Sequence, residues 1–127
     1  MTLAGTTGEA QALLQALCDA SYDSILLTEG ATGNIIYANA AFRTLTGYTP
    51  DAVRGRSPRL LQGPATDARV LERLSAAMKA GEAWEGKAIN YRIDGGAFIM
   101  QWRVVPVRVA GAIAFWLAVQ REAASIQ

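Results

Sequence analysis

The sequence predicts an α+β fold in which a five-stranded antiparallel sheet carries helices on one face and a flanking helix at the N-terminus. The first observation is the order of segments along the chain, which reads strand, strand, helices and then three strands. The second is a pair of turn sequences, GATGN at 30–34 and DGG at 94–96, each between two apolar segments. The length of 127 residues fits a single domain.

The composition excludes several function classes. Lysine and arginine number 12 against 11 acidic residues, so no strong field attracts nucleic acid or a membrane surface, and we predict neither partner. Histidine is absent, which removes the axial ligand of histidine-bound haem, the common zinc sites and histidine-based acid-base catalysis. The sequence also has no phosphate-binding glycine loop and no carboxylate cluster. We therefore predict no metal site and no enzymatic activity.

The single cysteine and the absence of targeting segments bear on the cellular location of the protein. Cys18 has no partner for an internal disulfide, and we expect it to pack against the domain as part of a helix. The N-terminus shows no signal peptide, and no apolar run approaches the roughly 20 residues that span a bilayer. These features favour a cytoplasmic location.

The chain divides into three parts. We predict a small polar tail and an amphipathic flanking helix in residues 1–20, the folded domain in 21–122 and a C-terminal tail in 123–127. The helix spans Glu9 to Ala20, because apolar side chains recur there at helical spacing: Leu13, Leu14, Leu17 and Cys18. This helix either packs on its own domain or stands outside it.

The first turn lies between two predicted strands, Ser24 to Thr28 and Ile35 to Ala38. Asn39 is a suitable N-cap for the helix that follows, and Gly47 is suitable just beyond its C-terminus. A short helical turn is expected at Pro50 to Val53.

A longer helix is predicted after Thr66 or Asp67, either of which is a suitable cap, and it ends at Gly81. Its apolar face carries Val70, Leu71, Leu74, Ala77 and Met78.

The last third of the chain reads as three strands, at Ala83 to Ile93, Ala97 to Val109 and Ala112 to Arg121. Pro106 requires a sheet edge or a bulge, because it has no amide hydrogen to donate. Side chains alternate along a strand, so two sets are expected to point into a pocket under the helices. These sets are Met100, Trp102 and Val104 on one strand, and Trp116, Ala118 and Gln120 on the next.

Two motifs carry a resemblance to a known family. Residues 55–62 read GRSPRLLQ, which resembles the signature GxNCRFLQ of LOV domains, the flavin-binding, blue-light-sensing branch of the PAS family. Here Ser57 replaces the asparagine, Pro58 the photoreactive cysteine and Leu60 the phenylalanine. Residues 35–50, IIYANAAFRTLTGYTP, resemble the family segment N-x-A-F-x-x-L-T-G-Y. The resemblance covers about Asp19 to Gln120 and implies the PAS order of strands and helices.

The resemblance implies a flavin site, with FMN or another flavin as the cofactor. Arg59 matches the arginine on the flavin phosphate, and Gln62 matches the glutamine on the ribityl chain. Asn90 matches the first of two asparagines on the pyrimidine edge. Gln120 matches the glutamine near the ring atoms N5 and O4, whose rearrangement carries the signal into the sheet. On the other reading, Arg59 is a solvated charge and the three amides satisfy backbone groups in a PAS core.

Several positions depart from the family pattern. Met100 stands where the family has its second asparagine, and Ser75 where it has a second phosphate arginine, for which Arg69 or Arg73 are the substitutes to consider. Two tryptophans face the predicted pocket, as core side chains or as electron donors to the flavin: Trp102 and Trp116.

Pro58 has no nucleophile, so the cysteinyl adduct with the flavin should not form. The resemblance then implies a sensory module in which blue light or redox state reduces the flavin to its semiquinone, and protonation at N5 changes the hydrogen bond to Gln120. The alternative is a PAS interaction module that has lost flavin binding and dimerises, or that binds another small ligand. The family often uses a flanking helix for dimer contacts, so a homodimer is expected, with an unknown effector protein or domain.

Overall fold

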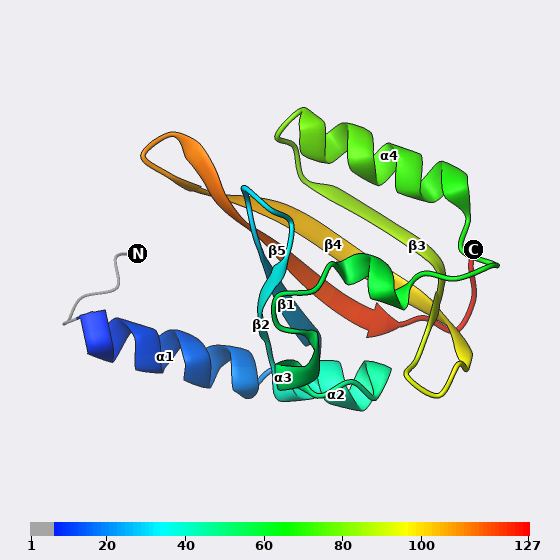
Figure 1. Cartoon of the computed structure of the whole chain (residues 1–127), viewed down its shortest axis with the longest axis horizontal. Coiled ribbons are helices and arrows are strands. Elements are labelled where there is room, and N and C mark those ends of the chain that lie inside the picture. The colour runs from blue at the N-terminus through cyan, green and yellow to red at the C-terminus, as the bar shows by residue number, and fades with distance from the viewer. Residues whose placement is uncertain (1–6) are drawn as a thin grey trace.

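The computed structural model describes residues 7–127 as a five-stranded antiparallel sheet with helices around it (Figure 1). The strand order is β2-β1-β5-β4-β3, and each neighbouring pair is antiparallel. The five strands are β1 (Ser24–Glu29), β2 (Ile35–Ala38), β3 (Trp84–Tyr91), β4 (Ala97–Val109) and β5 (Ala112–Glu122). The predicted fold class is confirmed.

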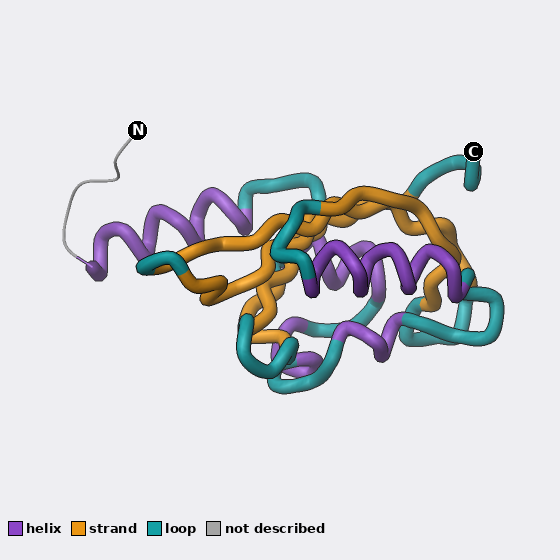
Figure 2. The backbone as a smooth tube through the Cα atoms, turned by 90° about the horizontal axis from the view of Figure 1, so that it is seen from above, coloured by secondary structure: helices purple, strands orange, loops and turns teal. Residues whose placement is uncertain are grey.

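The sheet carries its covering helices on one face, and the flanking helix projects to the side of them (Figures 1 and 2). The helical segments are α1 (Thr7–Asp19), α2 (Ala40–Thr46), α3 (Pro50–Val53), the 3-10 helix η1 (Pro58–Leu61) and α4 (Ala68–Lys79). Among residues 7–127, no helix is both long and apolar enough to cross a membrane.

The inner face of the sheet forms the core. Strand alternation buries Ser24, Leu26 and Thr28 on β1, while the intervening residues stay partly exposed. The two predicted sets on β4 and β5 are buried in the same way and share this face. Trp102 lies opposite Gln120 in the register between these strands. The core also receives Phe42, Val53, Leu61 and Val70 from the covering helices.

The predicted helix boundaries rest on identifiable caps. The Asn39 side chain accepts a hydrogen bond from the Phe42 amide, and Gly47 adopts a left-handed conformation with φ of 81° after α2. Asp67, rather than Thr66, caps α4 by accepting from the Arg69 amide at 2.9 Å. That hydrogen bond lowers the pKa of the Asp67 carboxyl below its usual value.

Pro58 and Pro106 occupy positions that need no amide hydrogen. Pro58 opens η1, where the amide would be unpaired, and the Ser57 hydroxyl accepts from the Arg59 amide at 3.2 Å. Pro106 pairs with Trp116 of β5, but the pairing of β3 reaches only as far as Val104, so no strand of residues 7–127 pairs with the other side of Pro106. The predicted edge position of Pro106 is therefore confirmed.

The element bounds differ slightly from the sequence prediction. Helix α1 begins at Thr7 instead of Glu9, and β3 is shorter at both ends than predicted. Of the two arrangements predicted for the flanking helix, the structure has the one outside the domain. Its leucines remain 46 to 58% exposed: Leu13, Leu14 and Leu17.

Candidate functional site

A cavity of about 820 Å³ opens between the turn after β1, the helix η1, the helix α4 and one end of the sheet. This volume lies in the range of small-molecule sites in proteins. Its wall consists of Thr28, Gly30, Thr32, Gly33, Ser57, Pro58, Arg59, Gln62, Leu71, Leu74, Ser75, Met78, Lys79 and Trp116.

The wall combines an apolar surface with polar groups and two cations. Leu71, Leu74 and Met78 project from α4, and the buried Trp116 lies on β5. Cationic side chains come from Arg59 on η1, and at the end of α4 from Lys79. Such a donor set suits a planar aromatic ligand that carries a phosphate, because the ring needs apolar contacts and the phosphate needs cations.

Five of the nine predicted site residues line this cavity: Ser57, Pro58, Arg59, Gln62 and Trp116. The other four, Asn90, Met100, Trp102 and Gln120, are buried on the inner face of the sheet and do not contribute to the wall. Met100 and Trp102 pack in the same apolar cluster as Leu61, Val53 and Phe42, and Trp102 also makes an edge contact with Trp84 at 4.8 Å between ring centroids. The flavin roles predicted for all nine residues stay predictions.

The two buried amides have different surroundings. The Gln120 Oε1 atom accepts a hydrogen bond from the Ser24 hydroxyl at 2.9 Å, with both residues under 5% exposed. Among residues 7–127, the Asn90 Nδ2 atom has a single long contact of 3.5 Å, to the carbonyl of Ala88. The amide NH₂ groups of both residues therefore keep donor capacity for a ligand, while the Gln120 oxygen already accepts from Ser24.

The sequence analysis did not identify Lys79, and of the two arginines considered in place of Ser75 neither lines the cavity. Arg69 and Arg73 are exposed and absent from the cavity wall, and Arg69 pairs instead with Asp67 at 3.5 Å. Ser75 does line the cavity, as its family position implies. Lys79 follows Ser75 by four residues and so shares its helix face, a spacing that would have identified it. In the described part of the chain, no three acidic, cysteine or histidine residues gather as a metal site would require.

The comparisons with known proteins agree with this geometry. Residues 23–122 match the PAS domain family. The light-state structure of the LOV domain of the blue-light photoreceptor Aureochrome1 superposes with a TM-score of 0.78 at 34% identity, covering 88% of this chain and 89% of that one. This chain is a PAS domain of the LOV family.

Further relatives of this LOV domain support the assignment. A LOV domain solved in a study of a flavin analogue matches with a TM-score of 0.79 at 31% identity, over 92% of this chain and 85% of that one. Phototropin-2 from rice is 46% identical over 74 residues, which is 58% of this chain but 8% of that protein. The chain thus spans only 8 to 20% of the length of the first curated relatives that it matches.

Proposed function

We propose that this LOV domain binds a flavin and senses blue light or redox state without a cysteinyl adduct, by photoreduction of the flavin to its semiquinone. The observation that carries the proposal is the cavity between η1 and α4, which joins an apolar wall to two cations. Pro58, at the adduct position, lies on that wall and offers no nucleophile. The similarity to blue-light photoreceptor domains supports the same conclusion.

FMN is the flavin that this wall suits best. Arg59 and Lys79 would hold its phosphate, and Gln62, which lines the same cavity, would donate to the ribityl chain. Trp116 and the leucines of α4 would contact the ring and exclude water from it. When bound, the flavin supplies absorption in the blue and the ability to take up an electron and a proton.

Gln120 would pass the change in the flavin to the sheet. Its carboxamide is buried on the inner face and accepts from Ser24 through Oε1. Protonation of flavin N5 would turn this atom from a hydrogen-bond acceptor into a donor. A donor at N5 would favour a Gln120 side chain flipped so that its carboxamide oxygen faces the flavin. A flipped Gln120 presents its NH₂ group to the Ser24 hydroxyl, so the hydrogen bond between β5 and β1 changes its direction.

Replacing Arg59 with alanine tests the phosphate site. We expect Arg59→Ala to weaken FMN binding by about tenfold, since a hydrogen bond to a charged group contributes about 1.5–3 kcal/mol and Arg59 is exposed to solvent. Riboflavin has no phosphate, and its affinity should change less than about twofold. Both affinities are measured by titration with fluorescence or absorption detection.

The matched control is Arg73→Ala, which removes an exposed arginine of α4 that does not line the cavity. It should leave both affinities unchanged. Equal losses for FMN and riboflavin in Arg59→Ala, or an equal loss of FMN binding in Arg73→Ala, would contradict the assignment of the phosphate site.

A second candidate function, a PAS interaction module, is favoured by the exposed leucines of α1. Leu14 and Leu17 are 50 and 58% exposed, and an apolar helix face of this kind is suited to bury itself against another protein. We propose that the partner is a second copy of this chain, and that an effector protein or domain receives the signal from the dimer.

Substitution of Leu14 and Leu17 together by serine should convert the dimer to a monomer. Burial of each leucine in the interface would contribute about 1.5–3 kcal/mol to the free energy of dimerisation, and the serine variant loses this contribution. Light scattering after gel filtration measures the mass. The control is Ile93→Ser, which removes an apolar side chain of matching exposure, 58%, that lies outside α1. A Leu14 and Leu17 variant with the mass of the unsubstituted protein rules out α1 as the dimer contact.

A further inference from the structure

The flanking helix α1 is tied to the domain at its C-terminal end. The Nδ2 atom of Asn39 donates to the carbonyl oxygen of Cys18, in the last turn of α1, at 2.7 Å. The same Nδ2 atom donates to the carbonyl oxygen of Asp23 at 3.0 Å. Beside these bonds, the Tyr37 hydroxyl donates to the Asp19 carboxylate at 2.8 Å.

Asn39 also reaches into the domain through its other side-chain atom. Its Oδ1 atom accepts from the amide of Ile25, in β1, at 2.8 Å and from the amide of Phe42, in α2, at 3.2 Å. Asn39 is 0% exposed, and both its donor and acceptor atoms are engaged. One buried carboxamide therefore joins α1, β1 and α2.

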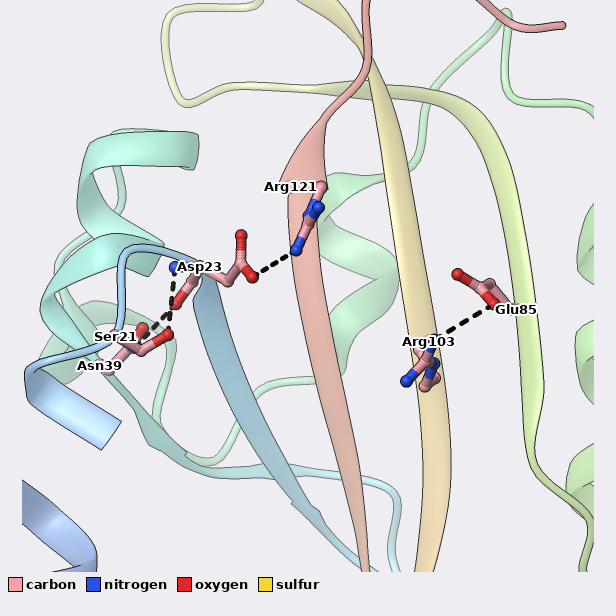
Figure 3. A network of polar contacts seen from close by, with 6 residues as sticks. All are labelled: Ser21, Asp23, Asn39, Glu85, Arg103 and Arg121. Carbon is pink, nitrogen blue, oxygen red and sulfur yellow. Dashed lines mark hydrogen bonds and ion pairs between the residues drawn. The ribbon is translucent and has the colours of Figure 1, made fainter. Parts of the chain in front are cut away.

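The start of β1 is held from both faces of the sheet by neighbouring residues of β5. On the inner face, the Ser24 hydroxyl donates to Gln120 Oε1 at 2.9 Å. On the outer face, Arg121 forms an ion pair with Asp23 at 2.6 Å (Figure 3). A change in the Gln120 side chain therefore acts directly on the residue that precedes Ile25.

We propose that Ser24 and Asn39 couple the side-chain state of Gln120 to the position of α1. This inference rests on the proposed function, in which Gln120 responds to the flavin. The Ser24 hydroxyl follows Gln120, and the planar peptide that joins Ser24 to Ile25 transmits the displacement to the bond between the Ile25 amide and Asn39 Oδ1. Asn39 Nδ2 then releases or retains the Cys18 carbonyl.

Labelling of Cys18 can measure this movement of α1. Cys18 is the only cysteine, it lies in the last turn of α1, and it is half-buried. Burial raises the pKa of the Cys18 thiol. While α1 is bonded to Asn39, this thiol should therefore react slowly with a thiol reagent such as 5,5′-dithiobis(2-nitrobenzoate). Release of α1 exposes the thiol and increases the labelling rate.

Two variants interrupt the connection at different points. Asn39→Asp keeps an acceptor for the Ile25 and Phe42 amides but removes the donor to the carbonyl oxygens of Cys18 and Asp23. Because the bond to Cys18 holds the end of α1, the variant should label Cys18 at least about fivefold faster in the dark, and light should add nothing. Ser24→Ala removes the hydroxyl that follows Gln120, so it should lose the response to light; because it breaks the same bond as loss of the Gln120 acceptor, its dark labelling rate should change in the same direction as that of Gln120→Leu. The unsubstituted protein should label about fivefold faster in blue light.

The matched control is Tyr37→Phe, which removes the hydrogen bond to Asp19 without touching Ser24 or Asn39. It should label faster in the dark and still respond to light. The proposal is overturned if Asn39→Asp labels at the unsubstituted rate, or if Ser24→Ala keeps the full light response.

The coupling can also be tested if the protein binds no flavin, in which case the proposed function fails on its own. Gln120→Leu removes the acceptor of the Ser24 hydroxyl. In the dark it should change the Cys18 labelling rate by about fivefold in the unsubstituted background and leave it unchanged in Asn39→Asp. An unchanged rate in the unsubstituted background overturns the coupling even if Asn39→Asp does not fold. If Asn39→Asp folds, the same change in both backgrounds overturns it as well.

Discussion

The Pro58→Cys variant, loaded with FMN, is expected to lose nearly all of its blue absorption in blue light and to recover it in the dark. Pro58 matches the photoreactive cysteine of the family signature and lines the cavity, so in the proposed complex the introduced thiol would lie against the flavin. The backbone should tolerate the change, because Pro58 opens η1 and its amide has no helical partner. In the same light the unsubstituted protein should give the spectrum of the semiquinone instead of that of a thiol adduct.

Pro58→Ser is the matched control, since serine has nearly the size of cysteine but no thiol. It should bind FMN as Pro58→Cys does and, in light, give the spectrum of the semiquinone with no thiol adduct. If Pro58→Cys binds FMN but keeps its absorption in light, the ring does not lie beside Pro58, and the assignment of the adduct position is wrong.

Phe42→Ala should cost about 3–5 kcal/mol of the free energy of unfolding, the usual range when a buried aromatic side chain is truncated. Phe42 is 0% exposed and belongs to the core cluster between the sheet and the covering helices. The total free energy of unfolding of domains of this size is about 5–15 kcal/mol, so Phe42→Ala should lose much of the stability. Urea unfolding followed by circular dichroism measures the difference.

The control for this substitution is Arg43→Ala, the next residue of α2, whose side chain is exposed. It should change the free energy of unfolding by less than about 0.5 kcal/mol. A loss below about 1 kcal/mol in Phe42→Ala would mean that the core between α2 and the sheet closes around the missing ring.

The fold was predictable because local signals and strand patterning agree. Asn39 and Gly47 mark the two ends of α2 by their backbone requirements alone, and both act as predicted. The alternation of side chains along β5, which predicted that Trp116 and Gln120 share one face, is also confirmed. The position of α1 could not be predicted, because its leucine spacing is the same whether the helix packs on its own sheet or on another protein.

The site was predictable only in part. Motif matching identified Arg59 and Gln62 on the cavity wall, because they belong to a continuous signature. It could not identify Lys79, because Lys79 belongs to no motif. Lys79 lines the cavity because of its position on the helical face of α4. The inner-face residues such as Gln120 were placed correctly in the sheet, but their distance from the cavity depends on how the helices fill the core.

The most direct test of the account is an absorption spectrum of the purified protein, recorded with added FMN before and after blue light. The account predicts a structured blue band from protein-bound flavin and its replacement in light by the spectrum of the semiquinone, with no thiol adduct. A colourless protein that leaves added FMN in its free form would contradict the central claim that the cavity between η1 and α4 is a flavin site.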